Sequence, residues 1–430
     1  MELSELFAQS VREVLPLARR KGLVSYFDYH GPNVELHTNV DSLRRGVHRI
    51  LLGLLDCFES GFVMFCAAVK VPHAGRTELT IHAAGTGAMD AAGIGSVSDR
   101  LQLQARSGSS RLPRSSGARS DGNCPATGGR VVLVNADTDG LIISLDLSVA
   151  ASEPVDRKRL PDAAGAIAWL ISPRPGDLGC IDRRLVRLGW RVRSFTSLAL
   201  APSLILAAPD VAAKAPHLLI VAEVTGAEVP TMEKIAAWRP ALWAVLAIVA
   251  GSPTRQLREG TSVDIRYLPI SPGELERFTS RVDRRTSTAE MRATAPTPFY
   301  TQESRRVLVV EDNLVNQIIA RGQLKALGYE VDMAGDGAQA LSCCRRSPPD
   351  VVLMDVDMPV MGGIEATEQI RAWQQVGTIP PFPIVAATAG QAIRKDECLR
   401  AGMDGYLSKP IDLQVLADEL HRVLPARATA

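Results

Sequence analysis

The sequence predicts an α/β protein, and the last third of the chain shows the pattern most clearly. From residue 305 to residue 425, short runs of consecutive apolar residues alternate with segments of helical character. A strand that is apolar throughout is buried on both faces, as in a parallel sheet with helices on each side. Because connections between parallel strands are right-handed, we expect a doubly wound sheet of five parallel strands here.

The expected elements of this region follow one another without long gaps. The first strand covers residues 307–310, and the helix after it ends before Gly328, a residue type that commonly ends helices. Further strands are expected at 330–334, 351–354, 383–387 and 405–407. Helices are expected at 315–327, 338–345, 392–401 and 413–423. Ligands of such sheets bind beyond the carboxyl ends of the strands, so a functional site is expected there.

Polar side chains stand at most of these strand ends. Glu311 and Asp312 follow the first strand, Asp355 the third, Thr388 the fourth and Lys409 the fifth. Three carboxylates in one crevice repel one another unless a cation joins them, and oxygen ligands favour a hard ion such as Mg²⁺. The pattern therefore predicts phosphoryl transfer to Asp355, with Mg²⁺ and Lys409 neutralising the phosphoryl oxygens.

Four segments of this region resemble the receiver domains of two-component response regulators, and most of all the receivers attached to hybrid histidine kinases. They are VLVVEDNLVNQ, DVVLMDVDMPVMGG, IVAATAG and GMDGYLSKPID. The resemblance implies a flavodoxin-like receiver fold with Asp355 as the phosphoacceptor. It implies at most autodephosphorylation as an activity of the receiver itself. A receiver that keeps the fold and these residues but is rarely phosphorylated is the alternative.

The resemblance also assigns roles to the metal-binding residues. Asp312 is implied as a direct Mg²⁺ ligand, and Glu311 as a ligand that acts mainly through water. Asp355 and the backbone carbonyl of Asp357 complete the implied set. Mg²⁺ is the one cofactor expected.

The remaining residues of the implied site concern the phosphoryl group and the response to it. Thr388 is implied to hydrogen-bond the phosphoryl group, and Tyr406 to swing inward with it. Lys409 is implied to add a positive charge, and Pro410 to follow it through a cis peptide bond, an option specific to proline.

Residues 165–285 contain a similar series of apolar runs, at 168–171, 218–221 and 242–249. The repeated spacing suggests a second domain of the same kind. The residues for phosphoryl transfer are missing from this second domain. Ser172 and Pro173 replace the acidic pair, and Ala222 or Glu223 falls at the phosphoacceptor position. No lysine follows the segment Tyr-Leu-Pro at 267–269. We expect a degenerate pseudo-receiver that neither binds Mg²⁺ well nor accepts phosphate, and that serves in interactions.

Residues 1–150 resemble, in the order of their features, the ATP-binding domain of histidine kinases. A helical segment at 40–59 is followed by glycine pairs at 85–87 and 93–95, and then by a predicted hairpin of strands within 128–147. In that family the helix supplies an asparagine for Mg²⁺, and the glycine-rich segments shape the nucleotide pocket. The resemblance implies an α/β sandwich.

Several departures point to a degenerate ATPase-like domain kept as a scaffold. Gly53 and Cys57 stand where asparagines are expected on the helix, and Ala83 where an adenine-reading aspartate is expected. None of the seven histidines lies on a helix suited to accept a phosphoryl group. An unrelated α/β domain with incidental glycines is the alternative.

Two stretches of low complexity interrupt the chain. Residues 104–129, rich in Ser, Gly and Arg, are expected to form a mobile loop, and residues 286–304, with two prolines, a linker. The expected domains are therefore 1–150, 165–285 and 305–425.

Composition narrows the class of function. The chain has 430 residues and a net charge of +1, which argues against a strongly basic nucleic-acid-binding protein. Its seven cysteines form no CxxC pair, so neither a zinc ribbon nor a disulfide framework is expected. The N-terminus does not resemble a signal peptide, and the apolar windows at 198–208 and 241–250 are too short to cross a bilayer. We therefore expect a cytoplasmic protein without membrane contact.

These features together predict a phosphorelay signalling protein. A partner histidine kinase or histidine phosphotransfer protein would donate a phosphoryl group to Asp355, and output would pass through protein–protein contacts. A homodimer is left open. Two alternatives also stay open: an active hybrid histidine kinase whose N-terminal domain binds ATP, and a non-catalytic scaffold or decoy that regulates a kinase. Saturable ATP binding would favour the first, and capture of a kinase by residues 1–285 the second.

Overall fold

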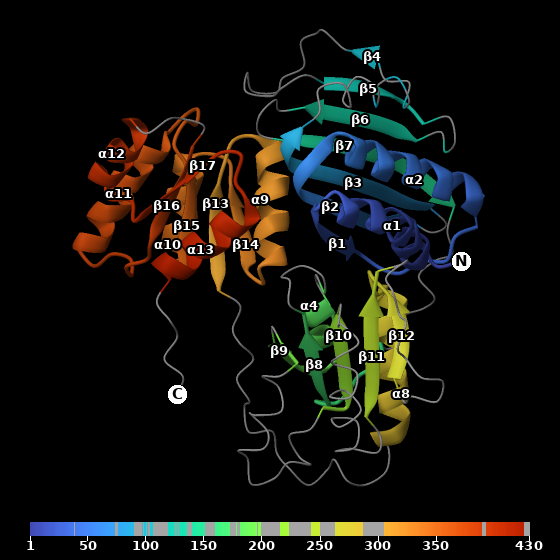
Figure 1. Cartoon of the computed structure of the whole chain (residues 1–430). Helices are drawn as coiled ribbons and strands as arrows, with labels where there is room; N and C mark the ends of the chain where they lie inside the picture. Colours follow the sequence, from blue (N-terminus) through green and yellow to red (C-terminus); the bar gives the residue numbers. More distant parts are fainter. Residues whose placement is uncertain are drawn as a thin grey trace.

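The computed structural model describes the chain from residue 1 to residue 424, with gaps. The gaps are residues 38, 74–75, 90–96, 98, 100, 102–103, 106–118, 125–126, 128, 136–139, 151–159, 173–177, 179–180, 196, 199–215, 223–241, 250–262, 287–304 and 389–392. The described residues form three sheets, each with its own helices (Figure 1). None of the described helices is long and apolar enough to span a membrane.

The N-terminal sheet has seven strands in the order β1-β2-β3-β7-β6-β5-β4. Its strands are β1 (Val24–His30), β2 (Phe58–His73), β3 (Arg76–Met89), β4 (Gln104–Ala105), β5 (Arg119–Asn123), β6 (Arg130–Asn135) and β7 (Leu141–Ala150). Strands β1 and β2 are parallel, and the other neighbours are antiparallel. The predicted hairpin is confirmed by the pairing of β6 with β7. Residues 93–95 lie outside the described residues.

Two helices, α1 (Leu3–Arg20) and α2 (Val40–Asp56), share one core with this sheet. Side chains alternate along a strand, so Val63 and Phe65 of β2 enter that core, whereas Phe62 and Met64 point to the opposite face. The predicted helix at 40–59 is three residues shorter, because Phe58 already begins β2.

The expectation of a mobile loop at 104–129 is wrong for the residues that the structure describes there. Strand β5 pairs along its whole length with β6, and β4 pairs with β5. Pairing at a sheet edge uses backbone groups, so a segment rich in Ser, Gly and Arg can add strands without large apolar side chains.

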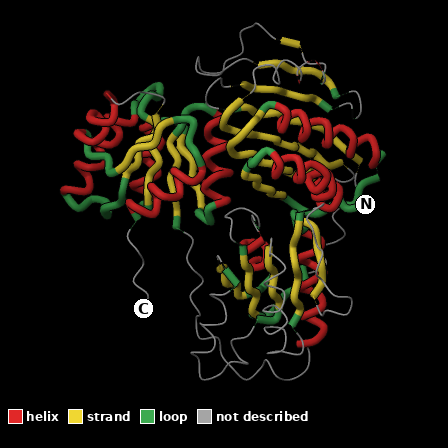
Figure 2. Tube along the Cα trace, viewed as in Figure 1, coloured by secondary structure: helices red, strands yellow, loops and turns green. Residues whose placement is uncertain are grey.

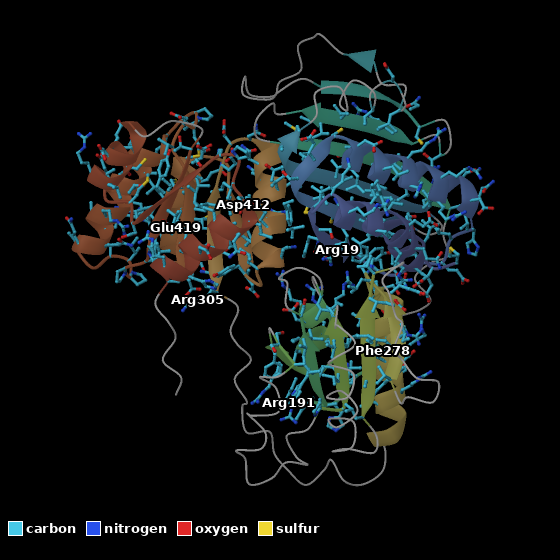
Figure 3. The ribbon with its side chains drawn as sticks, in the orientation of Figure 1. Arg19, Arg191, Phe278, Arg305, Asp412 and Glu419 are labelled. Atoms are coloured by element: carbon cyan, nitrogen blue, oxygen red, sulfur yellow. The ribbon has the colours of Figure 1, made fainter. Side chains whose placement is uncertain are left out.

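The middle sheet has five parallel strands in the order β12-β11-β10-β8-β9. Its elements are β8 (Ile167–Ile171), α4 (Ile181–Arg187), β9 (Arg191–Phe195), β10 (Leu218–Ala222), β11 (Trp243–Ile248), β12 (Val263–Tyr267) and α8 (Pro272–Thr286). Phe278 of α8, labelled in Figure 3, packs edge-on against Trp243, with ring centroids 4.6 Å apart. This contact fastens α8 to the sheet.

The C-terminal sheet also has five parallel strands, in the order β14-β13-β15-β16-β17. Its strands are β13 (Arg306–Val310), β14 (Glu330–Ala334), β15 (Val351–Asp355), β16 (Ile384–Thr388) and β17 (Gly405–Ser408). Its helices are α9 (Leu314–Ala326), α10 (Gly337–Arg346), α11 (Gly363–Gln375), α12 (Ile393–Arg400) and α13 (Leu413–Val423). The predicted doubly wound parallel sheet is confirmed, since separate apolar clusters fill its two faces.

Helix α11 is the one described element of this region that the sequence did not predict. Its buried residues are Gly363, Ala366, Thr367 and Ile370, so its inward stripe is narrow and mostly of small side chains. Such a stripe gives little of the apolar periodicity by which helices are predicted.

The three units touch one another directly. Helix α9 lies against the face of the N-terminal sheet that α1 and α2 leave open (Figure 2). On the other side, Arg12 of α1 donates to Glu274 of α8 at 2.6 Å and to the carbonyl oxygen of Pro269 at 2.9 Å. The N-terminal unit is therefore bound to both parallel-sheet units.

Candidate phosphoryl-acceptor site

Three carboxylates meet at the carboxyl edge of the C-terminal sheet. Strand β13 ends at Val310 and pairs with β15, so that Glu311 and Asp312 emerge beside Asp355. One carboxylate oxygen from each of these three residues lies within 4.8 Å of the others. Spacing of this kind lets a single divalent cation contact all three, and the oxygen-only donor set fits Mg²⁺.

Lys409 lies at the centre of this cluster. Its Nζ donates to Glu311 Oε2 at 2.6 Å and to Asp355 Oδ2 at 2.8 Å, and its side chain is only 8% exposed. Its backbone nitrogen donates to the carbonyl oxygen of Thr388 at 2.9 Å, which holds the lysine beside the end of β16. The Lys409–Pro410 peptide bond is cis, as the resemblance implied.

Burial and the neighbouring charges shift the pKa values of Glu311, Asp355 and Lys409. Burial raises the pKa of Glu311 to about 7; Lys409 opposes this increase and the Asp355 carboxylate adds to it. Burial also raises the pKa of Asp355, again against the effect of Lys409. Burial alone would lower the pKa of Lys409, but the two carboxylates raise it. Lys409 contacts two of the three carboxylates of the cluster, so one ammonium leaves room for a further cation.

The first turn of α9 holds Glu311 in place. Asn313 caps the helix by accepting from the backbone nitrogen of Val315, and its own backbone nitrogen donates to Glu311 Oε1 at 3.2 Å. Asn316 Nδ2 donates to the same oxygen at 3.1 Å, and Gln317 Nε2 to the Glu311 carbonyl oxygen at 2.6 Å. Sequence reasoning missed these residues, and the only available signal was a polar first turn directly after the acidic pair.

The two expected switch residues lie on the neighbouring strands. Thr388 is the last residue of β16 and is fully buried, one position beyond Ala387, which pairs with Asp355. Tyr406 is half-buried on β17, and its backbone nitrogen donates to Glu419 at 3.1 Å. Register places Thr388 one position beyond Asp355 and Tyr406, which pairs with Ala386, one position before it.

The loop after β15 is shaped closely around the acceptor. The backbone nitrogen of Asp357 donates to Asp355 Oδ1 at 3.3 Å, and the Asp357 residue is exposed. A Cβ at Gly363 would collide with the Asp355 carbonyl oxygen, so only glycine fits there. Val360 has a φ of 71° and is 88% exposed, an uncommon conformation for a β-branched residue.

The middle sheet repeats the strand register of the C-terminal sheet, so positions can be matched between the two. Strand β10 pairs with β8 as β15 pairs with β13. Ser172 therefore stands at the position of Glu311, and Ala222 at the position of Asp355. Glu223, the other candidate for that position, lies outside the described residues and one position further along.

The remaining two positions differ in the same way. Register between β11 and β12 places Ile248 at the position of Thr388 and Leu268 at that of Lys409. Both Leu268 and Lys409 are joined to the following proline by a cis peptide bond. The backbone arrangement is shared, whereas the acceptor carboxylate, the hydroxyl and the ammonium are replaced by apolar side chains.

In the N-terminal unit, the residues noted as departures are apolar and packed in the core. Ala83 and Cys57 are fully buried, and Cys57 Sγ lies 3.2 Å from the Gly53 carbonyl oxygen. A Cβ at Gly53 would come within 3.3 Å of Val97. Gly85 and Gly87 lie within β3, packed against β2.

Comparisons with known proteins agree with this geometry for the C-terminal region. Residues 307–421 match the family model described as the response regulator receiver domain. The sensor protein GacS of Pseudomonas syringae pv. syringae is 41% identical over 121 residues, which are 28% of this chain and 13% of that protein. The chain thus spans only a small part of the length of that curated relative.

Two solved structures extend the comparison. One is the receiver domain of a sensor histidine kinase from Pseudomonas aeruginosa, solved with a magnesium ion in its active-site cleft; the two sequences are 38% identical. The match covers 29% of this chain and 99% of that receiver domain, with a TM-score of 0.26. The other is a chain of the co-crystal structure of the Saccharomyces cerevisiae phosphotransfer protein Ypd1 and the Ssk1 receiver domain, which is 31% identical. The match covers 26% of this chain and 84% of that chain, with a TM-score of 0.26.

The sequence match covers the strands, the acidic edge and the buried lysine described above. The curated relatives of this chain are hybrid histidine kinases, and the match lies in their receiver domains. Residues 307–421 of this chain are a response regulator receiver domain.

Proposed function

We propose that this chain is a phosphorelay signalling protein that accepts a phosphoryl group on Asp355 from a histidine kinase or a histidine phosphotransfer protein. The observation that carries the proposal is the buried Lys409 ammonium, shared between Glu311 and Asp355 beside Asp312. A carboxylate nucleophile, a ready positive charge and a metal-binding donor set are the parts that phosphoryl transfer needs.

In the proposed reaction, an Asp355 carboxylate oxygen attacks the phosphorus of a phosphohistidine. The new O–P bond forms as the N–P bond breaks, and the imidazole nitrogen keeps the bonding electron pair. Lys409 turns from the carboxylates towards the phosphoryl oxygens, and the Thr388 hydroxyl donates a hydrogen bond to one of them. Tyr406 then moves inward and changes the surface that it leaves, a population shift driven by a local charge.

The residues present fit Mg²⁺. Asp312, Asp355 and the Asp357 carbonyl would hold the ion, with Glu311 acting through water. When bound, Mg²⁺ supplies the charge that neutralises the phosphoryl oxygens. Support for this part comes from the three carboxylate oxygens, which lie within 4.8 Å of one another, and from the burial that raises the pKa of Glu311 and of Asp355.

We assign non-catalytic roles to the other two units. The middle unit would be a pseudo-receiver, because apolar side chains stand at three of its four matched site positions. The N-terminal unit would be a degenerate ATPase-like scaffold, because its departures from the kinase pattern are buried and apolar. Output would pass through protein contacts, and we place the protein in the cytoplasm.

Intact-mass measurement tests the proposal. The full chain is incubated with Mg²⁺ and acetyl phosphate, alongside the Asp355→Asn variant and a control receiver of known activity. We expect one hydroxylamine-labile phosphoryl adduct on the wild type and none on the variant. No adduct under conditions that label the control receiver would instead support a non-catalytic regulator of a kinase.

A further inference from the structure

Helix α9 of the receiver is packed against the N-terminal sheet through a shared apolar cluster. The cluster contains Tyr26, Phe62, Met64, Ala84 and Ile142 of the sheet and Val315, Ile319, Ala326 and Leu413 of the receiver. All of these are at most 8% exposed. Asp412, labelled in Figure 3, caps α13 immediately before Leu413 and so fixes that contact.

Two glycines allow the close approach. A Cβ at Gly322 of α9 would collide with the Met64 side chain and come within 3.6 Å of Phe62. A Cβ at Gly140, the residue directly before β7, would lie 2.5 Å from Ile319. The helix and the sheet therefore pack against each other as closely as the elements of a domain core do.

The C-terminal end of α9 enters a charged junction of all three units. Asp28 of β1 is only 3% exposed, and its carboxylate lies 3.6 Å from Lys325 of α9 and 3.8 Å from Arg184 of α4. Arg183, also of α4, donates to the carbonyl oxygens of Lys325 and Tyr329 at 3.3 and 3.1 Å. One carboxylate of the N-terminal sheet thus holds a cation from each of the other two units.

The opposite end of α9 holds the acceptor site through Asn316, which donates to Glu311. A cavity of about 30 Å³ lies beside this contact, and its wall includes Glu311, Asn316 and Lys409 together with Thr86 of β3. Thr86 is 3% exposed, and among the described residues its hydroxyl has no hydrogen-bond partner. Thr86 of the N-terminal sheet therefore lines a cavity that borders the proposed phosphoryl-acceptor site.

We propose that the N-terminal sheet is an internal docking partner of the receiver and that docking through α9 slows phosphoryl loading of Asp355. This inference rests on the proposed function. In the docked arrangement Glu311 is held by Asn316 and by Lys409, and it must be released from the lysine before Lys409 can turn to a phosphoryl group. Because α9 is fixed on the sheet, its first turn resists that rearrangement.

Linkage gives the reverse effect. This reciprocity concerns the equilibrium and not the rate: if docking disfavours the phosphorylated state of Asp355, phosphorylation disfavours docking by the same factor. A phosphoryl group on Asp355 would then loosen α9 and expose both the helix and the sheet face to a partner. The charged junction at Asp28 would pass this loosening to the middle unit.

Two substitutions on opposite sides of the contact test the inference in the full chain. Gly322→Glu places a charged side chain of the receiver into the contact, and Met64→Glu does the same from the sheet without altering the receiver. Arg321→Glu is the matched control, because Arg321 is the exposed neighbour of Gly322 on the same helix. Hydrogen exchange of α9, β1 and β2 reports docking without a phosphodonor, and intact mass with Mg²⁺ and acetyl phosphate reports the loading rate.

We expect faster exchange and at least about fivefold faster loading in both contact variants, with the control like the wild type. Unchanged exchange in both variants would refute the docking, and faster exchange with unchanged or slower loading would refute the coupling alone. If the exchange difference is present but no protein is labelled while a control receiver is, the phosphoacceptor function fails and the coupling with it.

Discussion

Replacing Lys409 with methionine should destabilise the Mg²⁺-free protein, because it removes the one ammonium shared by two buried carboxylates. The lysine nitrogen lies 2.6 Å from Glu311 and 2.8 Å from Asp355, and all three side chains are at most 8% exposed. Breaking a buried ion pair by removing one partner costs about 3–5 kcal/mol, since the other charge is left unpaired. Methionine keeps most of the apolar volume of the lysine stem, so little packing is lost.

Part of that cost is relieved by protonation. Burial already raises the pKa of Glu311 to about 7, and loss of the lysine raises it further, so the carboxyl becomes neutral at a modest cost. We therefore expect a loss of about 3 kcal/mol in the free energy of unfolding at pH 8 without Mg²⁺, and a smaller loss at pH 5. Saturating Mg²⁺ should recover much of it, because the ion stabilises the folded state by mass action.

The assay is urea unfolding of the full chain at both pH values, with EDTA or with Mg²⁺, following hydrogen exchange of receiver peptides. Glu311→Gln completes a double-mutant cycle, and Lys409→Met should cost clearly less in that background. A loss below about 1 kcal/mol at pH 8, or the same loss in both backgrounds, would refute the view that Lys409 neutralises a cluster of buried carboxylates.

Three further predictions concern pH and packing. Because the pKa of Glu311 is raised in the folded protein, its contribution to stability is fully present below pH 4.5 and is lost as the pH rises to about 7. Stability of the Mg²⁺-free protein should therefore fall across this window, and a Glu311→Gln variant that falls equally would contradict the assignment. Burial lowers the pKa of His82, so the folded state resists its protonation and acidification below pH 6.5 should destabilise the N-terminal unit. His82→Gln should flatten that dependence in thermal unfolding followed by hydrogen exchange, and an unchanged slope would count against it. Gly363→Ala should cost about 1–3 kcal/mol and reduce phosphoryl labelling, since its Cβ meets the Asp355 carbonyl, whereas Gly335→Ala should stay within about 0.5 kcal/mol. Equal effects of the two glycine substitutions in urea unfolding would show that the collision at Gly363 is not real.

The receiver fold was predictable because short segments of its sequence indicate the strands and the residues at their ends. The apolar runs of β13, β15 and β16 predict the parallel sheet. The polar residues that follow the strands mark the edge at which Glu311, Asp355 and Lys409 meet. Helix α11 was missed because its buried stripe is narrow and made of small residues. The role of Asn316 was missed because an amide in a first helical turn also fits an ordinary solvent-facing position.

Long-range relations were less accessible from the sequence. Whether Ala222 or Glu223 matches the phosphoacceptor depends on strand register, which becomes visible only when β10 is paired with β8. The contact of α9 with the N-terminal sheet joins residues more than two hundred positions apart, such as Met64 and Gly322. Phe62 and Met64 lie on the second face of β2, and nothing in the local sequence says which element covers them.

Locating the phosphoryl group shows directly whether Asp355 accepts it. The full chain is loaded with Mg²⁺ and acetyl phosphate and reduced with borohydride, which converts a phosphorylated aspartate to homoserine, and the peptides are then sequenced by mass spectrometry. We expect homoserine at position 355, absent without the donor and absent from the middle unit. Homoserine at another position with Asp355 intact would contradict it.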